Sequence, residues 1–124
     1  MNIPENLIYS KSHEWVKVIA LEAIIGITMH IQEEMGDIVY IDLPEVGSKF
    51  KKGDSIAVVE SIKTVSDVYM PISGEIIEIN EKLIEQPELV NQDPYGQGWF
   101  VKIKINKKEE VLELMDSQTY KKFL

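Results

Sequence analysis

A single lysine, Lys63, lies between two short runs of strand-forming residues and is the side chain best placed for chemistry. The run before it, residues 56–59, and the run after it, residues 65–72, are rich in β-branched residues, and Pro71 and Gly74 mark the end of the second. Because only a few residues separate the runs, they predict a tight hairpin with the lysine amine at its exposed tip. An amine presented in this way is open to enzymatic modification, although most turn lysines are simply solvated.

The residues around Lys63 argue against a phosphate or nucleic-acid site. No other cation occurs between Lys52 and Lys82, and Glu60 and Asp67 make the turn acidic. The chain carries a formal net charge of -8, and its 13 cationic side chains are all lysine, so no arginine can grip a phosphate with two hydrogen bonds. We therefore expect no nucleic-acid partner.

No catalytic or metal-binding constellation is evident. His13 and His30 are the only side chains that titrate near neutrality without perturbation, and neither lies in an H-E-x-x-H metal motif. The chain has no G-x-S-x-G sequence, no phosphate-binding loop and no cysteine. We predict no metal site and no catalytic residue, and interpret the chain as a carrier whose chemistry resides in an attached group.

The elements that would position Lys63 are predicted to be mostly strands. Alternating residues predict further strands over residues 7–19, 23–27, 38–43 and 99–105. Thr28 is a candidate N-cap for a short helix over residues 29–35, and Gly36 a candidate stop. A helical turn is expected at 81–84 and a loop at 86–97. Two C-terminal helices are predicted, the first with an Asn106 cap and the second carrying Tyr120, Phe123 and Leu124.

A weak internal repeat adds to this picture. Residues 36–42 and 74–80 both follow the pattern G-(D/E)-I-(V/I)-x-I-(D/N). Two similar halves predict a sandwich of two small antiparallel sheets with pseudo-two-fold symmetry and the Lys63 turn at one end. The length of 124 residues favours one domain, residues 1–124.

Short motifs occur along most of the chain. They are Glu60-Ser61-Ile62-Lys63, Ser66-Asp67, Pro71-Ile72-Ser73-Gly74, Tyr9 to Trp15, Gly26-Ile27-Thr28 with His30, Gly36 to Pro44, Pro87 to Asn91, Pro94-Tyr95 and Gly98-Trp99. In these motifs the sequence resembles the H protein of the glycine cleavage system, a lipoyl carrier family, over residues 7–124. A biotin carrier would flank its lysine as A-M-K-M, which this chain lacks.

The resemblance implies a fold and a function. The fold would be mostly β with short helices, a lipoyl/biotinyl-type barrel-sandwich of two small antiparallel sheets plus C-terminal helices. Lipoate would be attached covalently to Lys63, by a lipoate ligase or a lipoyl/octanoyl transferase. The arm would carry the aminomethyl group of glycine from glycine decarboxylase (P protein) to the tetrahydrofolate-dependent aminomethyltransferase (T protein). Dihydrolipoamide dehydrogenase (L protein) would then reoxidise it.

The family's arm cleft maps onto Ser12, Glu14 and Asp67, with His30 nearby. Hydroxyl and carboxylate acceptors suit a cationic amine, and a cleft that excludes water would protect a labile group. An ordinary surface or turn role remains the alternative for each of these residues. The alternative for the whole chain is a lipoate relay or adaptor domain of the same fold that serves other lipoyl-dependent enzymes. A second alternative is a structural or adaptor domain that has kept the fold and lost the modification.

The sequence also bears on location and assembly. No run approaches the roughly 20 apolar residues that span a bilayer, and the first residues have no basic, apolar signal-peptide pattern. We expect a cytoplasmic monomer without a membrane partner, or a mitochondrial-matrix protein if the source is eukaryotic and a transit peptide has been removed.

Overall fold

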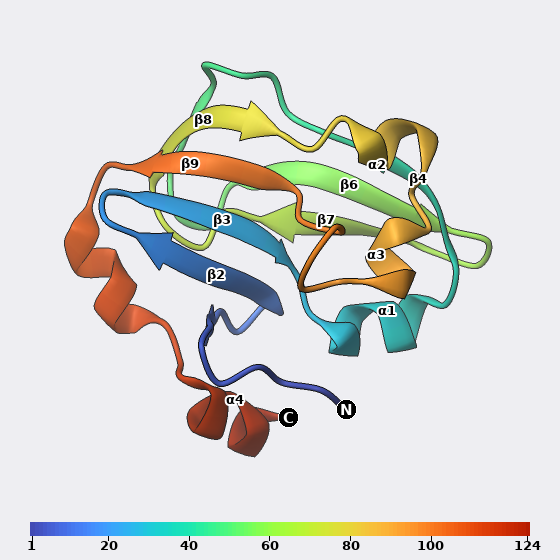
Figure 1. Ribbon diagram of the computed structural model, residues 1–124, viewed down its shortest axis with the longest axis horizontal. Helices are drawn as coiled ribbons and strands as arrows, with labels where there is room; N and C mark the ends of the chain where they lie inside the picture. The colour runs from blue at the N-terminus through green and yellow to red at the C-terminus, as the bar shows by residue number, and fades with distance from the viewer.

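The computed structural model describes all 124 residues and contains two antiparallel sheets, as the sequence predicts (Figure 1). The larger sheet has six strands in the order β1-β2-β3-β9-β8-β5, and the smaller has three in the order β4-β6-β7. The strands of the larger sheet are β1 (Ile8–Tyr9), β2 (Glu14–Ile19), β3 (Glu22–Ile27), β5 (Lys49–Phe50), β8 (Gly74–Ile79) and β9 (Val101–Ile105), and those of the smaller are β4 (Ile38–Asp42), β6 (Ser55–Ser61) and β7 (Val65–Tyr69).

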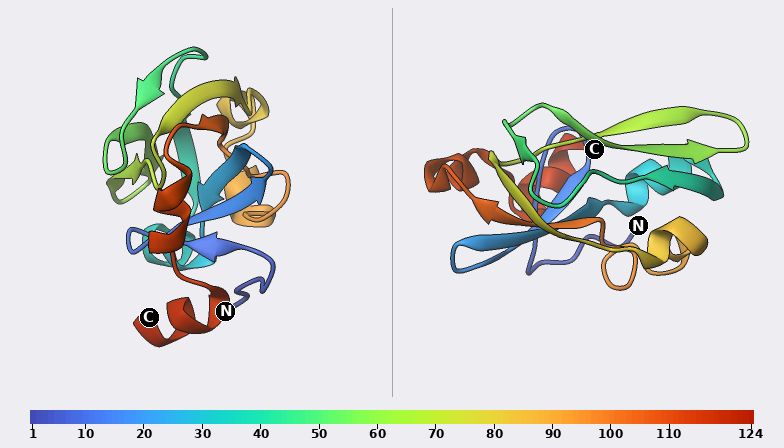
Figure 2. Two further views of the ribbon diagram at one scale, coloured as in Figure 1. Left: turned by 90° about the vertical axis from the view of Figure 1, so that its left-hand side faces the viewer. Right: turned by 90° about the horizontal axis from the view of Figure 1, so that it is seen from above.

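The core lies between the two sheets, which form separate layers when viewed from above (Figure 2). The predicted alternation of β9 is confirmed, because Val101, Ile103 and Ile105 are buried whereas Lys104 is exposed and Lys102 half-exposed. Burying one face of each strand supplies the main driving force for the fold.

Short helices close the ends and edges of the sandwich. They are α1 (Met29–Met35), α2 (Lys82–Glu85), α3 (Leu89–Gln92), the 3₁₀ helix η1 (Lys108–Glu113) and α4 (Ser117–Phe123). Figure 1 shows α4 below the sheets, beside the N-terminal segment, where Tyr120 stacks on Tyr9 with ring centroids 4.6 Å apart. No helix combines the length and apolar character needed to cross a membrane.

The two copies of the repeat lie in different sheets, as β4 and β8. The pairing of β4 with β6 has one irregularity in its register, between Ile38 and Tyr40. The pairing of β8 with β9 also has one, between Ile76 and Glu78. These positions are equivalent in the repeat, so the two segments resemble one another in strand irregularity as well as in residue pattern.

Several predicted boundaries are wrong. The single strand expected over residues 7–19 is two strands, β1 and β2, because the chain turns at His13, whose φ is +72°. The loop expected at 86–97 contains α3. The Thr28 side chain does not cap α1, although Gly36 does end it with φ +80°.

The C-terminal predictions are only partly right. The helix predicted after Asn106 is 3₁₀ rather than α, and the N-cap position falls at Lys107 without a side-chain cap. The helical spacing of Val111, Leu112 and Met115 predicts one apolar stripe packed on the core, but Leu112 is 86% exposed. Met115 lies beyond the helix and forms a backbone bridge with Tyr9. The last helix exists as α4, with Tyr120 buried.

Candidate functional site

The turn between β6 and β7 presents Lys63 at the end of the molecule opposite η1 (Figure 1). Ser61, at the end of β6, fixes this turn: its N–H donates to the Thr64 carbonyl at 2.8 Å, and its Oγ accepts the Thr64 N–H at 3.2 Å. Lys63 is exposed and has no hydrogen bond or ion pair. Its amine is therefore free to react.

The stem of Lys63 lies close to the end of α1. A Cβ atom built on Gly36 would be 3.8 Å from Lys63 Cε, and the two segments border a hollow of about 440 Å³. Beside the lysine, Ile62 is 86% exposed and Val65 62% exposed. The reactive amine thus stands among uncovered apolar side chains, which suits a site that other proteins must approach.

Glu14 is a buried carboxylate with three donors. Its Oε1 accepts the hydroxyls of Ser10 and Ser12, both at 2.5 Å, and its Oε2 accepts the Tyr69 N–H at 3.1 Å. Only 1% of Glu14 is exposed. Burial raises the pKa of Glu14 above its ordinary value, while the donors from Ser10, Ser12 and Tyr69 oppose that rise.

A cleft of about 480 Å³ opens above this carboxylate. Its walls include Ser10 and Ser12 from the β1–β2 connection and Tyr69 at the end of β7. Because β7 rises about 3.3 Å per residue, Tyr69 lies about 13 Å along the strand from Val65, the first strand residue after the Lys63 turn. The strand that starts beside the lysine therefore leads to the cleft.

The structure brings together only part of the predicted cleft set. Ser12 and Glu14 are hydrogen-bonded neighbours, as above. Asp67 is exposed on β7 and accepts the Ser55 hydroxyl at 2.9 Å, with no hydrogen bond to Glu14. His30 lies on α1, where its Nε2 is 2.7 Å from Glu34 Oε1, and it is not among the residues that line the cleft.

A second polar cluster lies beside the site and was not predicted. His13 Nδ1 is 2.8 Å from the Tyr120 hydroxyl, which is 2.8 Å from Thr28 Oγ1. The His13 and His30 rings have centroids 4.3 Å apart. Burial and the neighbouring His30 lower the pKa of His13. No sequence signal could have found this cluster, because 107 positions separate His13 from Tyr120.

Sequence reasoning also missed Ser10 and the Tyr69 N–H as partners of Glu14. The nearness of Ser10 in the sequence was a usable signal, whereas the Tyr69 contact, 55 positions away, was not. The side chains of the structure contain no group of three or more His, Asp or Glu arranged to hold a metal ion.

The family described as glycine cleavage H-protein matches residues 7–124. The glycine cleavage system H protein of Halothermothrix orenii is 53% identical over 124 residues, which is all of this chain and 97% of the relative. That of Thermotoga maritima is 51% identical over 115 residues, covering 93% of both chains. The crystal structure of a glycine cleavage system H protein from Mycobacterium marinum is similar, with a TM-score of 0.84, 35% sequence identity and 95% of each chain covered.

Proposed function

We propose that Lys63 bears the lipoyl group, because the chain belongs to the glycine cleavage H-protein family, whose members are the lipoyl carriers of glycine cleavage. The observation that carries this proposal is the exposed, unpaired amine at the β6–β7 turn. An amine without an ion pair can form an amide without first breaking a contact in the protein.

The residues present fit such a group. When bound, the lipoyl group supplies a disulfide that accepts the aminomethyl group of glycine. The chain offers a free amine for the attachment and, beside the end of β7, a cleft with a buried carboxylate beneath it. A larger groove of about 670 Å³ elsewhere on the surface contains no buried carboxylate.

Glu14 orients the hydroxyls that line the cleft. Ser12 and Ser10 both donate to Glu14 Oε1, and Ser10 Oγ also accepts the Glu14 N–H at 3.0 Å. Each hydroxyl oxygen has two lone pairs, so Ser10 keeps one and Ser12 keeps both to accept from another donor. A cationic amine in the cleft would meet these oxygens as acceptors, with the charge of Glu14 directly behind them. We propose that Ser12 and Glu14 hold the amine of the carried group and that the cleft walls keep water from it.

Asp67 and His30 do not line the cleft, and in this proposal they act on the carried group from outside it. Asp67 lies two residues before Tyr69 on the strand that leads to the cleft, where its carboxylate adds negative charge along the path of the arm. His30 contributes indirectly, because it packs against His13, the residue between Ser12 and Glu14.

The chemistry of the system would be performed by other proteins. We propose that the chain itself is not an enzyme, and that its partners are the decarboxylase, the aminomethyltransferase, dihydrolipoamide dehydrogenase and the enzyme that attaches lipoate. We further propose that residues 1–124 act as one monomeric domain, and that the protein works in the cytoplasm beside these partners.

The test is the intact mass of the protein produced in a lipoylating host, measured beside its Lys63→Arg variant. We expect one added lipoyl or octanoyl mass, present only when Lys63 is present. Lysines elsewhere on the surface, such as Lys82, serve as controls through Lys82→Arg, which should leave the added mass unchanged. An unmodified protein from a host with a competent ligase would overturn the assignment and favour an adaptor.

A further inference from the structure

The 3₁₀ helix η1 is held on the body of the protein more by polar contacts than by apolar burial. None of its residues is buried, Leu112 is 86% exposed, and Val111 is only partly buried against the core. A 3₁₀ helix has poorer hydrogen-bond geometry than an α-helix. Segments with few buried apolar contacts open locally at low free energy, so we expect η1 to open more readily than the strands.

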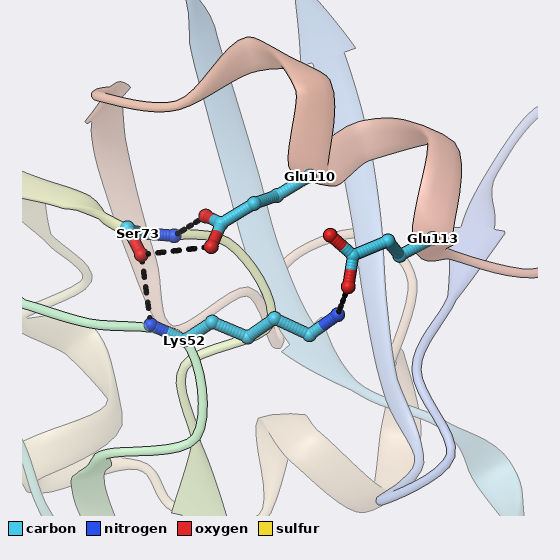
Figure 3. Close-up of polar contacts among 4 residues, drawn as sticks. All are labelled: Lys52, Ser73, Glu110 and Glu113. Carbon is cyan, nitrogen blue, oxygen red and sulfur yellow. Dashed lines mark hydrogen bonds and ion pairs between the residues drawn. The ribbon is translucent and has the colours of Figure 1, made fainter.

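Two carboxylates of η1 contact two different connecting segments, as Figure 3 shows: Glu110 meets Ser73 between β7 and β8, and Glu113 meets Lys52 between β5 and β6. Glu110 accepts the Ser73 N–H at 2.7 Å and the Ser73 hydroxyl at 3.2 Å, and Lys52 Nζ donates to Glu113 at 2.6 Å. Ser73 is only 5% exposed, whereas the Lys52 and Glu113 side chains are 36% and 57% exposed. Sheltered bonds to a charged group are stronger than a surface ion pair, so the Glu110–Ser73 contact is the main latch.

The latched segment reaches the wall of the cleft at its last residue. Glu113 lines the cleft together with Leu114 and Met115, which follow η1, and with Lys52 and Gly53. The Lys52–Glu113 ion pair therefore joins two parts of the cleft lining.

Both ends of the segment are tied down independently of the latch. Before η1, the Asn106 N–H donates to the Ser73 carbonyl at 2.9 Å. After η1, Met115 and Tyr9 exchange two backbone hydrogen bonds, both of 2.8 Å. Release of Glu110 would let the middle of the segment move while its ends stay in place.

Resting on the proposed function, we propose that residues 108–113 form a strap that ends in one wall of the cleft, at Glu113, and that the Glu110–Ser73 latch governs how readily water reaches the carried group. With the latch closed, the strap completes the wall of the cleft. With Glu110 released, the exposed Lys52–Glu113 pair is the one side-chain hydrogen bond that still joins the strap to the body of the protein. Glu110 is a positioning residue, since it acts through the strap and does not line the cleft.

The first test follows the latch in the unlipoylated protein, by amide hydrogen exchange at Ser73. The Ser73 N–H donates to the Glu110 carboxylate, so its exchange rate reports release directly. We expect Glu110→Ala to accelerate that exchange at least about tenfold, and Lys52→Ala to accelerate it less than about fivefold. Glu110→Gln keeps an acceptor but loses the charge, and should fall between the wild type and Glu110→Ala.

Glu109→Ala is the matched control, because Glu109 lies on the same helix, is exposed and makes no side-chain hydrogen bond or ion pair. Exchange at Met115, held by Tyr9, should remain as in the wild type in all variants. Equal Ser73 exchange in the Glu110 and Glu109 variants would overturn the latch.

The second test compares the lipoylated proteins after loading with the aminomethyl group of glycine. We expect the loaded form of Glu110→Ala to decay several-fold faster than that of Glu109→Ala, at the same lipoyl content by mass. If the two loaded variants decay at the same rate while Lys63 is modified, the proposed role of the strap is overturned and the proposed function stands. An unmodified Lys63 would overturn the proposed function and the strap's role together, so the two failures are distinguishable.

Discussion

Gly26 permits the close packing of Trp15, and replacing it with alanine should damage the fold in a calculable way. The two residues are direct cross-strand partners in β2 and β3. A Cβ atom at position 26 would lie 2.5 Å from Trp15 Cε2 and Nε1. Ordinary carbon contacts are about 3.5–4.0 Å, so the indole ring would have to move by roughly 1 Å.

That movement has two costs. Trp15 is 2% exposed, and displacing a ring in a packed core costs about 1–3 kcal/mol. The Trp15 Nε1–H also donates to the Pro94 carbonyl at 2.8 Å, and losing that bond costs about 0.5–1.5 kcal/mol. Alanine also restricts the unfolded chain more than glycine does, which stabilises the folded protein by about 0.4–1 kcal/mol. We expect Gly26→Ala to lower the free energy of unfolding by about 2–3 kcal/mol.

The assay is urea unfolding followed by far-ultraviolet circular dichroism, in a double-mutant cycle with Trp15→Phe. Phenylalanine lacks the indole nitrogen that the new methyl group would strike, so Gly26→Ala should cost at least about 1 kcal/mol less in that background. An equal cost in both backgrounds would refute the steric argument. A cost near zero in the wild type would refute it as well.

Two further predictions concern the site. Glu14→Gln should leave lipoylation intact but shorten the lifetime of the loaded form about tenfold, because the charge behind the serine hydroxyls is lost; an unchanged hydrolysis rate would contradict a sheltering role. His13 has a lowered pKa in the fold, so the unfolded chain binds its proton first, and stability should fall as the pH drops below about 6.5. His13→Asn tolerates the positive φ and cannot titrate, so its urea midpoint should change less between pH 8 and pH 5 than that of the wild type. Equal changes would exclude His13 as the source.

Local features were readable from the chain because they depend on neighbours in sequence. The isolated Lys63 between β-branched runs predicted the β6–β7 hairpin, and the alternation around Lys102 and Lys104 predicted β9. The first strand was predicted too long because its internal turn uses a histidine in the left-handed region, where glycine or asparagine is the usual signal. The exposure of Leu112 was missed because a helical spacing of apolar residues does not distinguish 3₁₀ from α geometry.

By itself, the sequence determined the hairpin that presents Lys63, the mostly β architecture, and the residue types available for a carrier. Only the tertiary structure decided that Glu14 meets the Tyr69 N–H, that His13 meets Tyr120, and that Glu110 latches onto Ser73. The physical reason is that these contacts join residues 37 to 107 positions apart. Their geometry depends on how the sheets pack and where the connecting segments cross, and a single-chain pattern carries no signal for either.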